Sequence, residues 1–303
     1  MNLHSALHTF VPRWEPRPCI ALATAVFAGA LAGCGGNAAS VAAVVPTGLV
    51  PLVGPHGSQV TIVLMENKDY NRVAGSPQAP YFNKTLVPQG VLLQNSHAIG
   101  HPSEPNYLAL FSGSTQGIHG DPCPVSFKAA DVASELIAAG KTFTGYSESM
   151  PHDGYKGCYH GLYDRNHNAW VEFKNVPSSD NLVYHGFPPT VATFVWITPN
   201  LCHDTHNCAV RIGDKWLSKN LPPIIAWDTE HDGLLILTWD EAAPDNSGKN
   251  HIPTVLVGPM IRAGVNDTQN VDHYAVLRTV EKILGVACIA KECKAPLLTG
   301  IWK

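Results

Sequence analysis

The stretch that decides the fold is VTIVLMEN, residues 60–67, in which an apolar run ends abruptly in a carboxylate and a carboxamide. A short continuous run rich in β-branched residues is typical of a strand that is buried on both faces of a sheet. Glu66 and Asn67 follow that strand directly. In parallel sheets, ligands bind beyond the carboxyl ends of the strands, so these two side chains stand where a binding site is expected.

Similar apolar runs recur along the chain, and segments with a helical pattern lie between them. We expect strands at 59–65, 91–94, 142–146, 192–198, 233–239 and 252–258, and helices at 105–112, 129–140, 213–231 and 273–285. This alternation predicts an α/β fold with a mostly parallel central sheet and helices on both faces. Pro222 and Pro223 predict a bend or a break in the helix at 213–231.

Oxygen donors gather at the predicted carboxyl edge of the sheet. Asp240 and Glu241 follow the run LLILTW, as Glu66 and Asn67 follow the first run. Carboxylate and amide oxygens suit a divalent cation, and clustered carboxylates repel one another unless a cation holds them. We therefore expect these four residues to be metal ligands.

Ser103 lies in HPSEPNYLALFSG, residues 101–113, where a helix is expected to begin. A serine before Pro105 suits a helix N-cap, and Gly113 suits the far end of the same helix. A hydroxyl at this point also faces the positive end of the helix dipole, where a phosphate would bind and an alkoxide would be stabilised. The residues alone leave the cap and the nucleophile as alternatives.

The beginning of the chain is typical of an export signal. Two arginines precede an apolar run of small residues, which predicts a signal peptide over residues 1–33. The run closes on LAGC, which resembles the lipobox of bacterial lipoproteins and predicts a lipid on Cys34; an ordinary cleaved signal peptide is the alternative. Residues 34–57 are expected to form a flexible tether, and 58–303 one catalytic domain in the periplasm, on the outer membrane or on the cell surface.

The other cysteines agree with export. Without Cys19 and Cys34, six of the eight remain, and an even set in an oxidising compartment favours three disulfides. The expected pairs are Cys123 with Cys158, Cys202 with Cys208, and Cys288 with Cys293. A zinc site is the weaker alternative because no pair has CxxC spacing.

The composition excludes one class of partner. The formal net charge is −4, whereas a surface that coats nucleic acid needs a basic face. We therefore expect a small-molecule or lipid-sized partner, contact with a membrane only through the N-terminal lipid, and no binding of nucleic acid.

Seven stretches taken together resemble one family. They are VLMENKDY, HPSEPNYLALFSGSTQG, YDRNHNAW, PNLCHDTHNC, LLILTWDE, IPTVLVGP and DHYAVLRTVE. In this order they resemble the bacterial acid phosphatases of the phosphoesterase family, which also includes phospholipases C and belongs to the alkaline phosphatase superfamily. The resemblance implies a small phosphorylated substrate and hydrolysis of phosphate monoesters through a phosphoserine intermediate.

The resemblance also implies roles for particular residues. Ser103 would be the nucleophile and a further metal ligand beside Glu66, Asn67, Asp240 and Glu241. Asn106 would contact a phosphoryl oxygen, and His167 would donate to a phosphoryl oxygen or to the leaving group. Because oxygen donors stand where two-zinc relatives have nitrogen, we expect a single divalent metal, with calcium, magnesium, manganese, iron and zinc all open.

Three further side chains have more than one interpretation. Asp204 and His206 suit a second metal, a phosphate pocket or a structural hydrogen bond. The resemblance makes His273 a candidate for the same phosphate or second-metal site, because superfamily relatives with two metals place a late histidine there; the preceding Asp272 is a good N-cap. Two other functions also stay open. One is cleavage of phosphodiesters at the same site, as in a phospholipase C, and the other is a surface lipoprotein that binds without catalysis.

Overall fold

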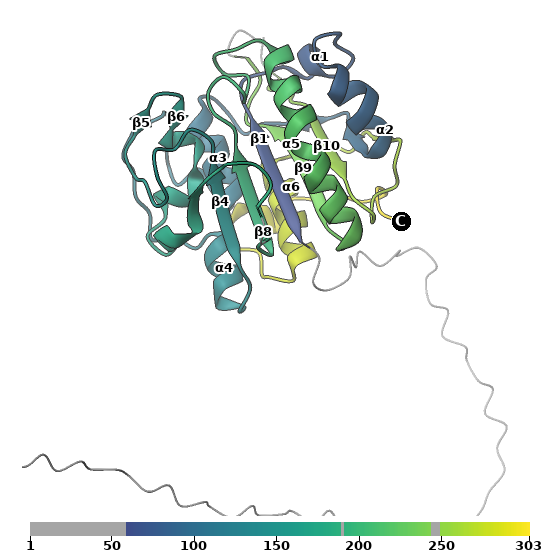
Figure 1. Cartoon of the computed structure of the whole chain (residues 1–303). Coiled ribbons are helices and arrows are strands. Elements are labelled where there is room, and N and C mark those ends of the chain that lie inside the picture. The colour runs from purple at the N-terminus through teal and green to yellow at the C-terminus, as the bar shows by residue number, and fades with distance from the viewer. Residues whose placement is uncertain (1–58, 189–190, 244–248) are drawn as a thin grey trace, which may run out of the picture. The chain divides into compact units, whose positions relative to one another are not determined.

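The computed structural model describes residues 59–188, 191–243 and 249–303. The signal peptide predicted over 1–33, the lipid on Cys34 and the tether over 34–57 lie outside the described residues. Within them, β1 (Val60–Met65) runs through the middle of an eight-stranded sheet (Figure 1). Glu66 follows β1 at once, as the apolar run predicts.

The sheet is mostly parallel, which confirms the expected fold class. Its strand order is β11-β2-β10-β9-β1-β8-β4-β7, and only β10 runs antiparallel to its neighbours, β9 and β2. The other strands of this sheet are β2 (Val91–Leu93), β4 (Phe143–Ser147), β7 (Asn181–Val183), β8 (Phe194–Thr198), β9 (Leu234–Trp239), β10 (Thr254–Val257) and β11 (Val265–Asp267). Two small sheets pair β3 (Ser96–His97) with β12 (Val271–Asp272), and β5 (Tyr159–His160) with β6 (Tyr163–Asp164).

Helices cover both faces of the large sheet. The α-helices are α1 (Tyr70–Val73), α2 (Val87–Gln89), α3 (Ser103–Ser112), α4 (Val132–Ala138), α5 (Val210–Glu230) and α6 (His273–Leu284). A π-helical turn, η1 (Phe82–Leu86), precedes α2, and the 3-10 turns are η2 (Arg165–His167), η3 (Ala169–Glu172), η4 (Ser178–Asp180) and η5 (Lys291–Lys294).

Alternation along the central strands builds two cores. Ile62 and Leu64 of β1 pack into a cluster with side chains of α3, α4 and α6, whereas Val63 and Met65 pack on the other face with side chains of α5 and η1. Because β1 is buried on both faces, every position except Thr61 is apolar, and the sequence does not alternate.

The helix after β8 does not break at its two prolines, so the break that was one of the two predicted outcomes is wrong. Helix α5 is continuous from Val210 to Glu230 with Pro222 and Pro223 inside it. A proline removes the hydrogen bond to the carbonyl four residues earlier, here those of Ser218 and Lys219. Both of these residues are exposed, so water can satisfy their carbonyls, while Leu217 and other apolar side chains on the opposite side hold the helix to the sheet.

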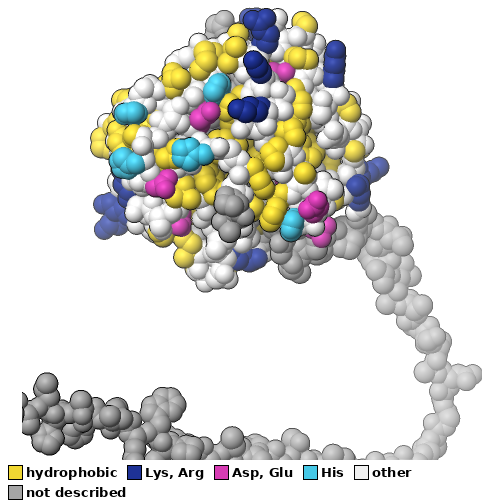
Figure 2. Space-filling model, in the orientation of Figure 1, with side chains coloured by type: hydrophobic (Ala, Val, Ile, Leu, Met, Phe, Trp, Pro, Cys, Tyr) yellow, Lys and Arg dark blue, Asp and Glu magenta, His cyan; other side chains and the backbone are white. Residues whose placement is uncertain are grey.

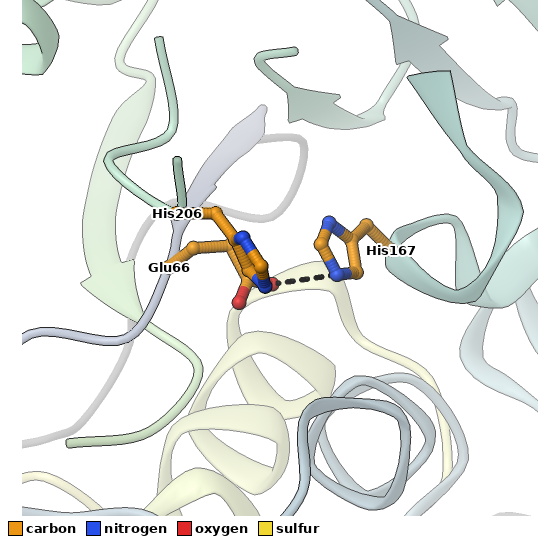
Figure 3. A group of neighbouring side chains, drawn as sticks. All are labelled: Glu66, His167 and His206. Atoms are coloured by element: carbon orange, nitrogen blue, oxygen red, sulfur yellow. Dashed lines mark ion pairs between the residues drawn. The ribbon is translucent and has the colours of Figure 1, made fainter. Parts of the chain in front are cut away.

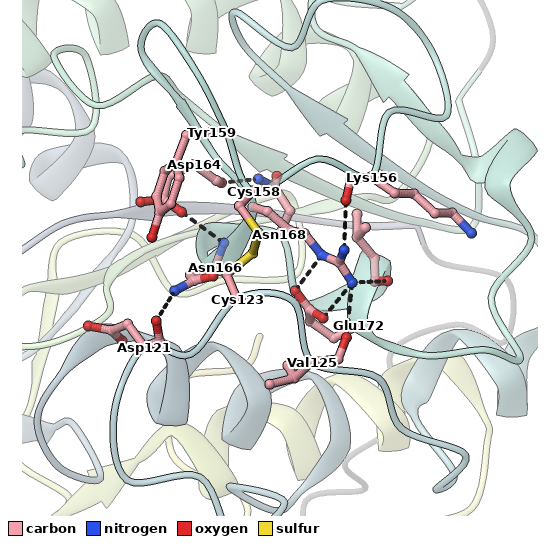
Figure 4. The surroundings of a disulfide bond; sticks show 12 residues. Asp121, Cys123, Val125, Lys156, Cys158, Tyr159, Asp164, Asn166, Asn168 and Glu172 are labelled. Atoms are coloured by element: carbon pink, nitrogen blue, oxygen red, sulfur yellow. Dashed lines mark hydrogen bonds and ion pairs between the residues drawn. A yellow bond between two sulfur atoms is a disulfide. The ribbon is translucent and has the colours of Figure 1, made fainter.

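All three expected disulfides are present: Cys123–Cys158, Cys202–Cys208 and Cys288–Cys293. The first lies beside a buried ion pair in which the Arg165 guanidinium donates to Glu172 (Figure 4). Disulfides persist in oxidising compartments, so this set supports an exported protein. No helix in the described part of the chain has the length and apolar character that crossing a membrane requires.

Candidate active site

Glu66 contacts several of the polar groups at the carboxyl edge of the sheet. Its side chain is fully buried, and it accepts hydrogen bonds from Tyr107 Oη at 2.5 Å and from Ser103 Oγ at 3.1 Å. Both donors lie in α3, near its N-terminus. The end of β1 and the start of α3 are therefore joined through one carboxylate.

Asn67 and Asp240 bring two strand ends together, as the parallel sheet predicts. The Asn67 amide nitrogen donates to Asp240 Oδ1 at 2.9 Å, and Asn67 adopts a left-handed backbone conformation with φ of 50°. Asparagine is one of the few non-glycine residues that visit this region. Asn67 Oδ1 and Asp240 Oδ2 are both buried without a hydrogen-bond partner among the described residues.

Ser103 is not the helix N-cap that the sequence suggests. Pro102 occupies that position, and Ser103 is the first residue of α3, with its hydroxyl turned to Glu66. The hydroxyl therefore belongs to the polar cluster and does not close the helix end. This geometry removes the capping alternative and leaves Ser103 Oγ at a helix N-terminus beside a carboxylate.

Asn106 and Glu241 lie next to the serine. Asn106 Oδ1 accepts from the amides of Ile99 and Gly100 at 2.9 and 3.1 Å, so the side chain holds the turn that precedes Ser103. Its Nδ2 lies 3.4 Å from Glu241 Oε2, which also pairs with His101 Nδ1 at 2.9 Å. The contact of Asn106 with a phosphoryl oxygen stays a prediction.

Two histidines lie beside Glu66, and each comes from a different segment. His167 ends η2, with Nε2 3.4 Å from Glu66 Oε1 and Nδ1 3.7 Å from Asp204 Oδ2. His206 comes from the loop after β8, and Figure 3 shows both rings close to the Glu66 carboxylate. One ligand atom from each of the three residues lies within 4.8 Å of the others, a spacing that suits a metal ion.

Asp204 and His273 are placed differently. Asp204 is fully buried; its Oδ1 accepts from the His206 amide at 2.7 Å, and its Oδ2 has no hydrogen-bond partner among the described residues. His273 Nε2 donates to the Asp240 carbonyl oxygen at 2.6 Å, and Asp272 caps α6 by accepting from the Ala275 amide. Thus the Asp204 side chain belongs to the cluster, whereas the His273 side chain contacts the backbone of Asp240 and not its carboxylate.

Burial and mutual repulsion dominate the electrostatics of the cluster. Burial, with Asp240 and Asp204 nearby, raises the pKa of Glu66 well above its ordinary value, and burial also raises the pKa of Asp240. Glu241 has its pKa raised to about 9 by burial and by Asp240. Burial lowers the pKa of His273. Burial, together with the neighbouring carboxylates for Glu66 and Glu241, thus disfavours the charged form of these carboxyl groups in the absence of a cation.

These residues fit a divalent cation. Asn67, Asp204 and Asp240 each have a buried acceptor oxygen with no hydrogen-bond partner among the described residues, and a buried acceptor without a donor is costly. A cation would satisfy these oxygens and offset the repulsion between the carboxylates. Hard oxygen ligands suit magnesium, calcium or manganese, while the histidines beside Glu66 also suit zinc or iron, so the donor set does not select one metal.

Sequence reasoning missed three residues of the cluster. Tyr107 belongs to the apolar pattern of α3, Lys68 follows the ligand pair, and Thr205 lies between Asp204 and His206. Thr205 has φ of 80°, which is a rare conformation for a β-branched residue and marks a position held in place by its surroundings. Only the position of Tyr107 and Lys68 within the quoted motifs could have indicated that they belong to the site. A tyrosine or a lysine by itself does not indicate such a role.

Solved structures define the class of fold. A protein of the alkaline phosphatase superfamily from Vibrio parahaemolyticus aligns with 81% of this chain and 72% of its own, with a TM-score of 0.56 and 15% sequence identity. At this identity the likeness shows the fold alone. The chain has an alkaline-phosphatase-like α/β fold.

The sequence comparisons then give the family. The model of the Phosphoesterase family matches residues 76–287, so the chain belongs to that family and is a phosphoric ester hydrolase. It is 38% identical over 268 residues to a phosphatidylinositol-3-phosphatase from Mycobacterium tuberculosis, covering 86% of this chain and 88% of that protein. It is 30% identical to a probable acid phosphatase from Kluyveromyces lactis, covering 73% of this chain and 56% of that longer protein. These relatives support phosphatase activity.

Proposed function

We propose that the protein is a metal-dependent acid phosphatase that hydrolyses phosphate monoesters with Ser103 as its nucleophile. One observation carries this proposal: Ser103 Oγ is the first side chain of α3 and donates at 3.1 Å to the buried carboxylate of Glu66. A hydroxyl at a helix N-terminus lies where the backbone amides and the helix dipole favour a phosphate group.

The residues of the cluster divide the chemistry. Ser103 Oγ passes its proton to the Glu66 carboxylate that it contacts and forms a bond to phosphorus, while the bond from phosphorus to the ester oxygen breaks. His167 is the proposed proton donor to the departing oxygen, and water then cleaves the phosphoserine to release inorganic phosphate. Asn106 and Tyr107 fix the positions of the reacting groups. Asn106 holds the turn before Ser103, and Tyr107 holds the Glu66 carboxylate.

The proposed metal ligands are Glu66, Asn67, Ser103, Asp240 and Glu241. When bound, a divalent cation at this position would favour the ionised serine oxygen and offset charge on the phosphoryl group. Asp204 and His206, with His167, form the second group of candidate ligands or a phosphate pocket. The buried oxygens of Asn67, Asp204 and Asp240 that accept no hydrogen bond from the part of the chain described support both parts of this proposal.

The relatives suggest where to look for a natural substrate. The Mycobacterium tuberculosis protein is named for a lipid that carries a phosphate monoester, and the Kluyveromyces lactis protein is named an acid phosphatase. We therefore propose small or lipid-borne phosphate monoesters as the substrate class and expect no binding of nucleic acid. Phosphatidylinositol 3-phosphate is the first lipid to assay.

We also propose that the mature protein is a lipoprotein anchored through Cys34 at the cell envelope. The proposal rests on the LAGC sequence after an apolar run, together with the three disulfides of the catalytic domain. Mass spectrometry of the mature N-terminus should find acyl groups on Cys34. An unmodified Cys34, or a mature N-terminus at another residue, would contradict the anchor.

The test of catalysis compares two chromogenic esters on the disulfide-bonded protein. We expect p-nitrophenyl phosphate to be cleaved faster than bis(p-nitrophenyl) phosphate, and a chelator to abolish the reaction. Ser103→Ala should lose turnover by at least about 10³-fold, as expected for a covalent nucleophile, and should fold normally because Ser103 does not cap its helix.

Each outcome bears on a different part of the proposal. Wild-type turnover by Ser103→Ala would exclude the covalent mechanism. Faster cleavage of the diester would assign the site to phosphodiesters. Ser103→Cys is a useful matched variant, since it keeps a nucleophile of similar size at the same position while changing its affinity for hard cations.

A further inference from the structure

A cavity is lined by residues of the loop that follows β8 and of α5. Its volume is about 570 Å³, within the usual range for small-molecule sites. Six of its lining residues carry the argument: Glu148, Tyr184, His203, Lys215, Trp216 and Lys219. They come from the ends of β4 and β7, from the loop after β8, and from α5.

The cavity and the active site share two chain segments. His203 lines the cavity, while the next residue, Asp204, lies 3.7 Å from His167 Nδ1 in the active-site cluster. Glu148 also lines the cavity, while its neighbour Ser147 donates to Asn168, the residue after His167. The cavity and the active-site cluster are therefore joined through residues 147–148 and 203–204.

The positive charges of the cavity have no partner of their own. Lys215 and Lys219 are exposed and one turn apart on α5, and neither forms an ion pair with any residue that the structure describes. Like charges at this spacing on a helix repel each other slightly. Figure 2 shows Lys and Arg side chains gathered in the upper part of the face that carries α5.

The acidic side chain in the cavity is already engaged. Glu148 Oε1 accepts from Trp216 Nε1 at 3.1 Å, and its Oε2 accepts from the Asn200 amide at 3.0 Å and lies 2.8 Å from His203 Nδ1. Glu148 therefore holds the cavity wall and leaves the two ammonium groups available to a ligand. The buried rings of Trp216 and Tyr184 give the cavity an apolar floor.

We propose that this cavity binds a second anionic group of the substrate while the phosphate monoester to be cleaved lies at Ser103. The inference rests on the proposed phosphatase function and narrows its substrate class to compounds that carry two anionic groups. Lysine ammonium groups bind phosphate as point charges, and the aromatic floor would contact the carbon chain that joins the two groups. The structure thus assigns substrate selection to α5 and catalysis to α3.

The test uses two substrates that differ only in the second phosphate, hexyl phosphate and 1,6-hexanediol bisphosphate. Beyond a statistical factor of two for its two ends, we expect the wild-type protein to prefer the bisphosphate by about tenfold in kcat/KM, which corresponds to about 1.4 kcal/mol. Lys215→Ala with Lys219→Ala should remove this preference by raising KM for the bisphosphate. Turnover of hexyl phosphate should not change.

A matched control removes the same charge elsewhere. Lys128→Ala with Lys174→Ala alters two exposed lysines that lie beside the pairing of Phe127 with Phe173, outside the cavity. This variant should keep the preference. The proposal would be overturned if the variant with Lys215→Ala and Lys219→Ala kept the wild-type preference for the bisphosphate. It would also be overturned if this variant lost activity equally on both substrates.

A binding measurement separates the cavity from the proposed chemistry. Calorimetric titration of Ser103→Ala with 1,6-hexanediol bisphosphate should give an affinity about tenfold above that for hexyl phosphate, and the two lysine substitutions should abolish the difference. If the wild-type protein cleaves neither ester, the phosphatase proposal fails while this titration still tests the cavity. If both esters bind equally, the cavity proposal fails while phosphatase activity stands.

Discussion

At the residue scale, the active-site cluster is held by contacts that do not themselves take part in the chemistry. Lys68 Nζ donates to the carbonyl oxygens of Asn67 and Thr205 at 3.0 and 2.7 Å, so one ammonium joins the end of β1 to the loop that carries His206. Thr205 Oγ1 donates to the Glu66 carbonyl at 2.8 Å. Asn67 and Thr205, whose carbonyl oxygens accept from Lys68, both have a left-handed backbone conformation. Lys68 thus stabilises two strained positions at once.

Replacing Lys68 by Met should release this connection. The two carbonyls would lose a charged donor, and an unsatisfied buried acceptor costs about 1 to 3 kcal/mol. We expect the free energy of unfolding to fall by an amount of this order, and kcat/KM for p-nitrophenyl phosphate to fall by at least about tenfold, because His206 and Asn67 would lose their fixed positions. Denaturant unfolding and steady-state assays measure the two effects.

The control for Lys68 is Lys84→Met, which alters an exposed lysine of η1. It should change neither quantity beyond about 0.5 kcal/mol, as is usual for exposed positions. Wild-type kcat/KM in Lys68→Met would show that Asn67 and His206 keep their positions without the ammonium.

The same residues show how far sequence reasoning reaches. The positions of Glu66, Asn67, Asp240 and Glu241 could be predicted because apolar strands are recognisable and parallel strands end at one edge. The contact of Lys68 with Thr205 spans 137 residues and depends on the path of a loop. Local patterns carry no information on such a path, so this contact could not be predicted.

At the scale of elements, α3 and α5 show where local rules give way to packing. A serine before a proline is a good N-cap by propensity, yet Ser103 lies inside α3 because its hydroxyl bonds to Glu66 from another element. Two adjacent prolines should interrupt α5, yet apolar side chains such as Leu217 and Leu221 hold it on the sheet. In both cases contacts with β1 or the sheet outweigh a local preference of about 1 to 3 kcal/mol.

The loop between Asn200 and Cys208 shows how one short element serves two sites. The Cys202–Cys208 disulfide closes it, and the Asn200 side chain accepts from the Cys202 and His203 amides at 3.1 and 3.0 Å. Asp204 then lies in the active-site cluster and His203 in the cavity beside α5. Two neighbouring residues of this constrained loop therefore contribute to two different sites.

At the scale of the whole molecule, buried carboxyl groups outside the active site make stability depend on pH. Burial is the largest cause that raises the pKa of Asp131 to about 6, of Asp228 to about 7 and of Glu281 to about 9. A carboxyl group whose pKa is raised on folding binds its proton more tightly in the folded state, so folding stability falls as pH rises. The fold is therefore expected to be more stable in acid than in alkali.

Asp228 provides the clearest test, because its carboxyl group is fully buried and has no hydrogen-bond partner among the described residues. In the unfolded chain an aspartate ionises near pH 4, whereas in the folded protein the pKa is about 7. The contribution of Asp228 to stability is therefore complete below about pH 4 and is lost as the pH rises to about 7. Asp228→Asn, which cannot ionise, should match the wild-type protein at pH 4 and exceed its free energy of unfolding by about 1 to 3 kcal/mol at pH 8. Denaturant unfolding at the two pH values measures the difference.

Asp232→Asn removes the same formal charge from an exposed position four residues away and should leave the pH dependence unchanged. An equal effect of both substitutions would show that net charge, and not burial of Asp228, governs this pH range.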